Sequence, residues 1–231
     1  MITLLTYDAP HRKTQDVAWR LLSHARKFKV VAIPWIDRKP RRFLYAHRPA
    51  EMTWPCEALG QPETVFANLG VDYLVCPSMD CVRTLVEDGP VVIGGAGILP
   101  KEVVENHDVL NVHPGLLPAS RGLDILKWSI LDLRRVGVTA HLCDQYTDLG
   151  WRILDRRVPV YHSDSFHSFA MRQYEMELDL IDAALELLET KTKDDFERIE
   201  KEDTEARRRM PRRKEAGLLE AFERFKLVYA K

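Results

Sequence analysis

Short apolar runs alternate with amphipathic segments along most of the chain. The apolar runs predict strands over residues 2–7, 29–35, 72–76, 90–93, 109–113, 137–143 and 151–160. Apolar residues at helical spacing predict helices from about residue 13, over 62–69, over 81–87, from residue 98, over 123–135 and over 165–192. The order strand, helix, strand at the amino end is typical of a parallel sheet. We therefore expect an α/β protein with a doubly wound, mostly parallel sheet flanked by helices.

The composition changes after Lys193, where acidic and basic residues follow one another densely. Such a run is typical of an exposed, partly helical connector. An amphipathic helix is predicted near residues 218–229. We expect a main domain over residues 1–192 and a short, mainly helical extension over residues 193–231. The extension either packs back on the domain or mediates a homodimer.

Overall composition excludes several classes of protein. The 231 residues are 45% hydrophobic, which is enough for one sizeable core. The formal net charge of -1 gives no sign of a surface that binds nucleic acid. The first apolar run is short and its basic residues follow it, the reverse of a signal peptide, and no run is long enough to span a membrane. We expect a soluble, cytoplasmic protein with neither a membrane nor a nucleic-acid partner.

The four cysteines are Cys56, Cys76, Cys81 and Cys143. They form no CxxC pair and have no histidine at zinc-binding spacing, so no metal site is predicted. Three of them lie in or beside apolar runs. We expect buried free thiols in a reducing compartment.

The stretch 111–122, NVHPGLLPASRG, carries the first candidate chemistry. Asn111 and His113 project from the same face of a predicted strand, because alternate residues of a strand share a face. Pro114, Gly115 and Pro118 then force a stiff, irregular loop. An amide beside an imidazole suits polarisation of a carbonyl and movement of a proton. For two isolated residues, a hydrogen-bonded pair that closes a turn is the commoner situation.

A second candidate site follows the first strand, in the connection DAPHRKTQD at residues 8–16. Ligands of open α/β sheets bind beyond the carboxyl ends of strands. His11, Arg12 and Lys13 are therefore candidates for binding an anion such as a phosphate or carboxylate. The connection lacks the glycines of a dinucleotide-binding fingerprint or a P-loop, and a basic helix start on the surface explains it equally well. The run RKPRRF at residues 38–43 is a further basic candidate, although such runs are more often simply solvated.

Three stretches together carry a resemblance to a known family: GGAGILP at 94–100, NVHPGLLPASRG at 111–122 and GVTAHLCDQYTDLG at 137–150. Their order and spacing resemble the formyl-tetrahydrofolate-dependent formyltransferases, which include glycinamide ribonucleotide, methionyl-tRNA and sugar-nucleotide N-formyltransferases. The resemblance covers about residues 70–190. It implies a Rossmann-like formyltransferase fold and 10-formyltetrahydrofolate as the formyl donor.

The resemblance implies a catalytic trio at Asn111, His113 and Asp148. An amine would attack the formyl carbon, and an oxyanion would form there. Asn111 can donate a hydrogen bond to the oxyanion without carrying charge, and protonated His113 can donate a second. Asp148 can keep His113 cationic and help to remove the proton of the amine, through water.

The resemblance also implies where the donor would bind. It places the folate against the backbone of residues 96–99 and the loop 144–148, and the glycines at 94, 95 and 97 suit close backbone approach. The implied donor-binding residues are Ala96, Gly97, Ile98, Leu99, Asp144 and Tyr146. Thr139 and His141 are expected to play a structural or supporting role.

The ends of the chain depart from particular family members. The connection 8–16 lacks the glycine-rich phosphate-binding turn of glycinamide ribonucleotide formyltransferase, and the tail is unlike the separate barrel domain of methionyl-tRNA formyltransferase. The expected acceptor is therefore a small molecule, an amino sugar that is free or nucleotide-linked. The alternatives are another small amine or a hydroxylamine such as a hydroxyornithine, hydrolysis of formyl-folate by water, and a folate-binding module without turnover.

Overall fold

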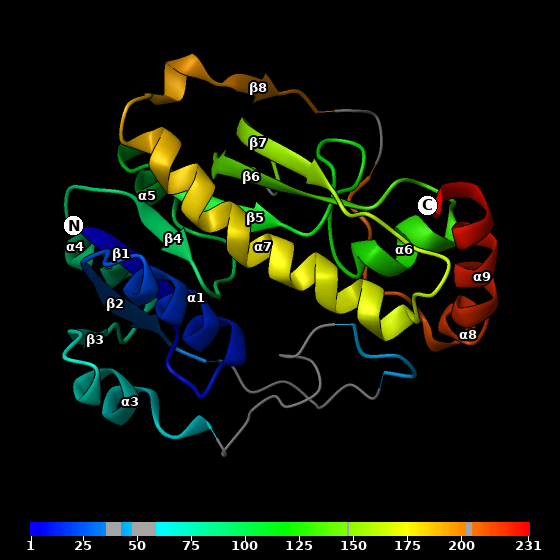
Figure 1. Cartoon of the computed structure of the whole chain (residues 1–231). Coiled ribbons are helices and arrows are strands. Elements are labelled where there is room, and N and C mark those ends of the chain that lie inside the picture. Colours follow the sequence, from blue (N-terminus) through cyan, green and yellow to red (C-terminus); the bar gives the residue numbers. More distant parts are fainter. Residues whose placement is uncertain (36–42, 48–58, 147, 202–204) are drawn as a thin grey trace.

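The computed structural model describes residues 1–35, 43–47, 59–146, 148–201 and 205–231. The strands in these residues form one sheet in the order β3-β2-β1-β4-β5-β6-β7-β8 (Figure 1). Their bounds are β1 (Ile2–Tyr7), β2 (Phe28–Ile33), β3 (Tyr73–Val75), β4 (Val91–Ile93), β5 (Val109–His113), β6 (Gly137–Cys143), β7 (Gly150–Arg157) and β8 (Glu197–Ile199).

The sheet has a parallel half and an antiparallel half. Strands β3, β2, β1, β4 and β5 pair in parallel, whereas β6, β7 and β8 continue the sheet in antiparallel fashion from β5. The prediction of an α/β fold with a mostly parallel sheet is confirmed. Strand β5, which ends at His113, lies at the junction of the two halves, so its side chains can meet groups that arrive from both.

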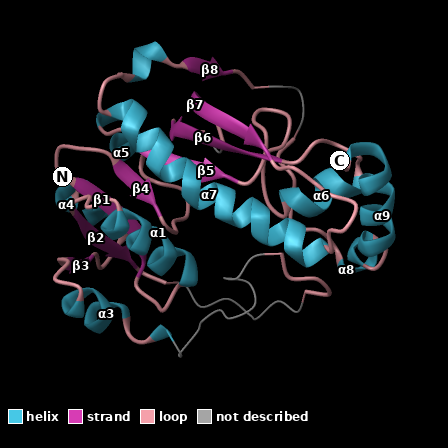
Figure 2. Ribbon diagram, in the orientation of Figure 1, coloured by secondary structure: helices cyan, strands magenta, loops and turns pink. Residues whose placement is uncertain are grey.

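Helices cover both faces of the sheet (Figure 2). The longer ones are α1 (Arg12–Ser23), α7 (Phe166–Leu188) and α9 (Leu218–Tyr229), and the shorter ones are α3 (Pro62–Asn68), α4 (Val82–Leu85), α5 (Lys101–Asn106), α6 (Ile125–Leu131) and α8 (Arg212–Glu215). Successive side chains of a strand point to opposite faces of the sheet, so alternate residues pack into two different buried clusters. Leu4 and Leu110 pack with α1 and α7, whereas Leu5 and Val109 pack with α4 and α5. The two faces explain why the parallel strands read as continuous apolar runs.

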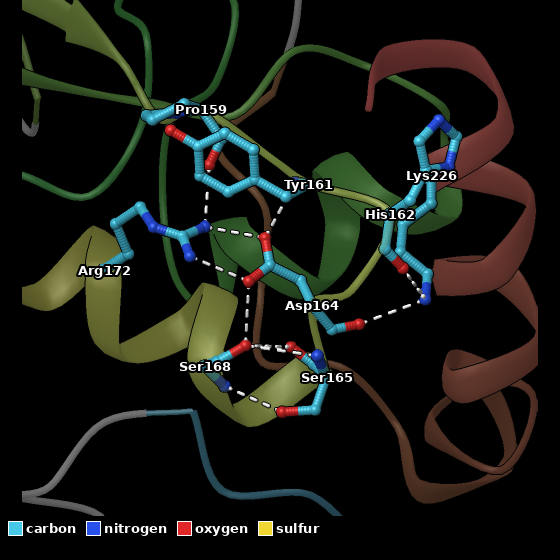
Figure 3. Close-up of polar contacts among 8 residues, drawn as sticks. All are labelled: Pro159, Tyr161, His162, Asp164, Ser165, Ser168, Arg172 and Lys226. Atoms are coloured by element: carbon cyan, nitrogen blue, oxygen red, sulfur yellow. Dashed lines mark hydrogen bonds and ion pairs between the residues drawn. The ribbon is translucent and has the colours of Figure 1, made fainter. Parts of the chain in front are cut away.

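Helix α7 begins at a capping box made by Ser165 and Ser168 (Figure 3). The preceding Asp164 binds the guanidinium of Arg172 through both of its carboxylate oxygens, at 2.7 and 2.8 Å. These hydrogen bonds lower the pKa of Asp164 to about 2. The carbonyl of Asp164 accepts a 3.0 Å hydrogen bond from Lys226 of α9. The start of α7 is thus tied to the C-terminal helix.

The tail differs from the expected exposed connector. Residues 193–201 include the turn η3 (Lys193–Asp195) and strand β8, which pairs with β7 at the edge of the sheet. Further on, the ring of Phe222 in α9 stacks on Phe169 of α7, and the ring of Phe225 packs against Phe169 at a tilt. The tail therefore packs back on the rest of the molecule. The domain boundary at residue 193 stays a prediction, although β8 and α9 share the sheet and the core with earlier residues.

The expectation of free thiols is wrong for Cys76 and Cys81, which form a disulfide. The short turn η2 (Met79–Cys81) brings their Cα atoms to 5.9 Å, within reach of a disulfide. Cys143 is a free thiol, and burial raises its pKa to about 12, so it is protonated at neutral pH. Cys56 lies outside the described residues.

No helix among the described residues has both the length and the apolar character needed to cross a membrane. In the same residues, no group of histidine, cysteine and acidic side chains is arranged to hold a metal ion.

Candidate active site

His113 lies at the end of β5 and is almost fully buried. Its Nδ1 is 3.3 Å from Asp148 Oδ1, and its Nε2 is 2.8 Å from the carbonyl oxygen of Ser120. Both partners are acceptors, so a ring that carries a proton on each nitrogen satisfies both, whereas a neutral ring leaves one contact unmade. The two acceptors therefore fix the orientation of the His113 ring.

Asp148 arrives from the connection between β6 and β7, in a left-handed backbone conformation with φ of 56°. Its Oδ2 accepts a 2.8 Å hydrogen bond from the backbone N–H of Gly122. Burial raises the pKa of Asp148, but the charge and hydrogen bond of His113, together with the Gly122 N–H, more than offset this and lower the pKa to about 2. The carboxylate is therefore ionised at neutral pH, and it faces His113 as a charged pair.

Asn111 lies two residues before His113 on the same face of β5, as the sequence predicted. Its amide Nδ2 lies 3.1 Å from Nε2 of His141, and Nδ1 of His141 lies 3.1 Å from the carbonyl oxygen of Leu149. Burial, and then the positive charge of His113, lower the pKa of His141 to about 4, so this ring is neutral. The two contacts fit a ring that donates from Nδ1 and accepts at Nε2. His141 thereby fixes the Asn111 amide, which retains a second N–H for a ligand.

The loop that follows His113 is held by side chains from three other elements. Thr139 of β6 donates to the carbonyl of Gly115 (2.7 Å) and accepts from the N–H of Leu117 (3.1 Å). Arg152 of β7 donates to the carbonyl of Leu117 at 3.0 Å, and Gln173 of α7 donates to the loop as well. These contacts give Thr139 the structural role that the sequence suggested.

Gly115 lets this loop close tightly on the His113 ring. A Cβ at this position would lie 2.5 Å from the carbonyl oxygen of Ser120 and 3.0 Å from Nε2 of His113. Any larger residue would have to displace either the imidazole of His113 or the Ser120 carbonyl that contacts it.

Two loops carry the residues predicted to bind the formyl donor. Ala96, Leu99 and Cys143 pack against the same buried cluster, so the segment after β4 and the loop after β6 rise from one region of the sheet. Side chains on these loops remain open to a ligand: Ile98 is 82% exposed and Tyr146 is 59% exposed, and nothing lies within 4 Å of a Cβ built on Gly97. The apolar surface and the accessible backbone fit a planar, hydrogen-bonding group such as a pterin.

Asp144 is placed differently from its neighbours on this loop. Its Oδ2 binds Arg198 of β8 at 2.6 Å, and its Oδ1 accepts from the N–H of Tyr146 at 2.7 Å. The carboxylate thus orders the loop rather than projecting into solvent. Direct binding of a donor by Asp144 stays a prediction.

The basic residues after β1 do not converge. Arg12 binds both carboxylate oxygens of Asp16, at 2.8 and 3.0 Å, and Lys13 lies 3.3 Å from the buried carboxylate of Glu177. His11 contacts Thr14 at 2.8 Å. Two of the three basic residues therefore face carboxylates of the protein itself, and the part of all three in substrate binding stays a prediction. Residues 38–42 of the second basic run lie outside the described residues.

Sequence reasoning missed the C-terminal contact that supports the site. Residues 121–123 exchange backbone hydrogen bonds with Arg207: its N–H donates to the carbonyl of Arg121, and its carbonyl accepts from the N–H of Leu123, each at 2.8 Å. Gly122, whose N–H binds Asp148, has a φ of +101°, and a Cβ there would lie 2.2 Å from the Arg207 carbonyl oxygen. Backbone contacts of this kind leave no side-chain pattern in the sequence. The final glycine of NVHPGLLPASRG, Gly122, was the one available signal.

Known proteins resemble this chain in sequence. A family model described as "Formyl transferase" matches residues 79–185, which include Asn111, His113 and Asp148. The methionyl-tRNA formyltransferase of Geobacter sulfurreducens is 28% identical over 137 residues, which cover 58% of this chain and 43% of that protein. That of Anaeromyxobacter dehalogenans is 31% identical over 163 residues, 69% of this chain and 50% of that protein. The chain spans about half the length of the curated relatives it matches.

Solved structures share the fold. A sugar N-formyltransferase from Shewanella sp. superposes with a TM-score of 0.57 and 22% identity, covering 89% of this chain and 74% of that one. A phosphoribosylglycinamide formyltransferase from Bacillus halodurans gives 0.58 and 18%, covering 83% and 96%. A formyltetrahydrofolate deformylase from Pseudomonas syringae gives 0.58 and 19%, covering 80% and 59%. At these identities the similarity establishes the architecture alone.

Proposed function

The chain belongs to the formyl transferase family, and from that premise we propose that it transfers a formyl group from 10-formyltetrahydrofolate to a primary amine. The observation that carries the proposal is the buried His113–Asp148 ion pair, 3.3 Å apart, with the Asn111 amide on the same strand face. A protein that only binds folate does not need this trio.

The contacts suggest how the trio divides the work. Nε2 of His113 is committed to the Ser120 carbonyl at 2.8 Å, whereas the contact of Nδ1 with Asp148 is longer, at 3.3 Å. The Nδ1 proton is therefore the one that a developing oxyanion can share, beside the second N–H of Asn111. Such contacts strengthen as the charge develops, which is what acceleration of the reaction requires.

Asp148 then accounts for the proton of the amine. The neutral amine forms a bond to the formyl carbon, and the carboxylate accepts the proton that its nitrogen loses. The bond from the formyl carbon to the folate nitrogen breaks, and that nitrogen takes up the proton that Asp148 accepted, so that a formamide and tetrahydrofolate leave and the carboxylate is regenerated. The low pKa of Asp148 means that the carboxylate is ionised at neutral pH, as this step requires.

We propose an amino sugar, free or nucleotide-linked, as the acceptor. Its support is the sugar N-formyltransferase from Shewanella, whose fold matches 89% of this chain. A cavity of about 400 Å³ beside the loop 119–122 is lined by Trp128 and by four arginines, Arg121, Arg134, Arg207 and Arg208. Arginines bind phosphate well, and this suits an acceptor that carries phosphate.

A second candidate acceptor is an amine carried on RNA, as in methionyl-tRNA. Six of the eight residues from 207 to 214 are basic, and Arg207 contacts the loop that holds Asp148. The curated relatives named above are methionyl-tRNA formyltransferases. The absence of a nucleic-acid partner stays a prediction, and this basic segment is the observation that argues against it.

An acceptor screen tests the proposal. The protein is incubated with 10-formyltetrahydrofolate and, separately, with nucleotide-linked amino sugars, free amino sugars, small amines and hydroxylamines, methionyl-tRNA, or no acceptor, and tetrahydrofolate is followed by absorbance. We expect release that depends on an amino sugar. Dependence on methionyl-tRNA would select the second candidate, and formate without any acceptor would identify a hydrolase. No folate product under any condition would refute formyl transfer.

The location and oligomeric state remain proposals. We propose a cytoplasmic protein, and the Cys76–Cys81 disulfide is the observation against a fully reducing compartment. Sedimentation of the purified protein would show whether it forms a homodimer.

A further inference from the structure

Strand β8 brings the tail of the chain beside the loop predicted to bind the formyl donor. It lies beside β7 (Figure 1). It pairs with the first three residues of β7, so that Arg198 lies opposite Trp151. The connection 144–149 directly precedes these residues. Residues of the tail are therefore neighbours of the loop, although about fifty positions separate them in the sequence.

Arg198 has two partners that fix its guanidinium. Its Nη2 lies 2.6 Å from Asp144 Oδ2, and its Cζ lies 4.2 Å from the centre of the Trp151 ring. The Asp144 side chain is only 8% exposed, and its other oxygen binds the N–H of Tyr146. One carboxylate thus joins β8 to the turn that presents Tyr146.

The charge of Arg198 also matters for the reaction centre. Asp144 and Asp148 lie four residues apart in one loop, and the charges of both act on the nearby Cys143 thiol. Without Arg198, Asp144 would lose its ion pair, and the loop would carry a second negative charge besides that of Asp148. With Arg198 in place, the charge of Asp144 is matched locally, and Asp148 is left to pair with His113.

We propose that Arg198 is a positioning residue for formyl transfer: by binding Asp144 it holds the turn at residues 144–146 in the shape that binds the formyl donor and keeps Asp148 against His113. The inference rests on the proposed function for the identity of the ligand. The contact of Arg198 with Asp144 is independent of that function. The tail that the sequence assigned to a separate extension thereby becomes part of the catalytic unit.

Lys193 supplies a matched control for Arg198. Its Nζ lies 3.9 Å from the centre of the same Trp151 ring, but it has no contact with Asp144. Lys193→Ala removes a cation from Trp151, and so does Arg198→Ala. Any effect that comes merely from loosening the edge of the sheet should appear in both variants.

The first measurement is hydrogen exchange of the full-length protein without ligand. We expect the amides of residues 144–148 to exchange faster in Arg198→Ala and at the wild-type rate in Lys193→Ala. Equal exchange in wild type and Arg198→Ala would overturn the proposal, whatever the function of the protein.

The second measurement is the affinity for a non-transferable formyl-folate analogue, followed by calorimetry. Because Arg198 is partly exposed, we expect Arg198→Ala to weaken binding by about five- to tenfold, with KM for the amine little changed and the thermal midpoint equal to that of Lys193→Ala. Asp144→Asn should add little to Arg198→Ala, because the two residues act through one contact. Additive losses, or an equal loss in Lys193→Ala, would overturn the positioning role.

The two measurements test the proposed function and the role of Arg198 separately. Wild-type protein that shows no heat with the folate analogue would refute the proposed function. Faster exchange in Arg198→Ala alone would still establish that this residue holds the loop.

Discussion

The connection that follows β1 and the end of β5 each carry a side chain that faces a carboxylate, yet the two pairs are built in opposite ways. After β1, Arg12 pairs with Asp16 one turn further along the same helix, and its side chain is 49% exposed. At the end of β5, His113 meets a carboxylate from a distant connection, and the two side chains are 5% and 12% exposed. The first arrangement is local and solvated, as in most surface helices. The second brings two elements together in a low-dielectric environment, where it can shift the pKa of a group and stabilise charge.

This comparison shows why residue type alone does not identify a site. Both connections lie beyond the carboxyl ends of strands, where α/β proteins bind ligands. What distinguishes the two pairs is whether the partner comes from the same helix, as Asp16 does for Arg12, or from another part of the sheet, as Asp148 does for His113. Substitutions in the two connections should therefore differ greatly in effect.

The largest effect is expected for His113→Ala. The ring is predicted to stabilise charge mainly in the transition state, so kcat should fall on the order of a hundredfold or more while binding of a folate analogue persists. Turnover is measured per folded molecule, with the folded fraction taken from the thermal transition. A folded variant with wild-type turnover would show that His113 only closes a turn.

A smaller effect is expected for Gly115→Ala, which replaces none of the side chains proposed to be catalytic. The new Cβ would lie 3.0 Å from His113 Nε2 and 2.5 Å from the Ser120 carbonyl, so the loop must move at a cost of about 1–3 kcal/mol in stability. We expect a roughly tenfold or greater loss of kcat. Gly217→Ala is the control, because nothing lies within 4 Å of its Cβ. Equal behaviour of the two variants would contradict the role given to Gly115.

A still smaller loss of activity is expected for His141→Leu, which removes the hydrogen-bond acceptor for the Asn111 amide. Turnover should fall by about tenfold, because the amide loses its orientation, and the KM of the donor should change less. His141 has a pKa of about 4, so its titration should leave no step in the rate profile between pH 5 and 8. Unchanged turnover in a folded variant would mean that Asn111 needs no such support.

The smallest effect is expected for Arg12→Ala. An exposed pair between residues one helical turn apart contributes about 0.3–0.5 kcal/mol, so stability to denaturant should fall by roughly that amount. The KM of the acceptor decides whether the arginine does more. A rise of about tenfold or more would show that the connection after β1 binds an anionic group of the acceptor, as the sequence predicted.

The sequence revealed those parts of the fold whose signal is local. Strands β1, β5 and β6 are apolar runs that end in recognisable turns, and all three were predicted within a residue. Strand β8 has three residues, Glu197, Arg198 and Ile199, and its pairing with β7 leaves no periodic pattern. The Cys76–Cys81 disulfide likewise depends on a turn whose geometry the residue types do not disclose.

The candidate site divides in the same way. Alternation along a strand placed Asn111 and His113 on one face, but it gave no partner for them. Asp148 came from the family resemblance, and its contacts with His113 and Gly122 come from the structure. The supporting contacts of His141 and Arg207 join residues far apart in the chain, so they required the three-dimensional arrangement.

Two carboxylates make a stringent test of the difference between a catalytic and a structural ion pair. Asp148 and Asp164 both have a pKa lowered to about 2, one beside His113 and the other beside Arg172. Since each pKa is lower in the folded state, each carboxylate stabilises the protein above about pH 4, and this contribution is lost as the pH falls toward 2. For the buried Asp148 it amounts to roughly 2 kcal/mol. Replacement by asparagine should reduce the acid sensitivity of unfolding at both positions.

Turnover per folded molecule at neutral pH, compared between Asp148→Asn and Asp164→Asn, tests the central claim most directly. Both substitutions preserve shape and remove one negative charge. If the Asp148 carboxylate accepts the proton of the amine, Asp148→Asn should lose on the order of a hundredfold in kcat, whereas Asp164→Asn should keep wild-type turnover. Equal turnover in the two variants would contradict the claim that the His113–Asp148 pair is catalytic.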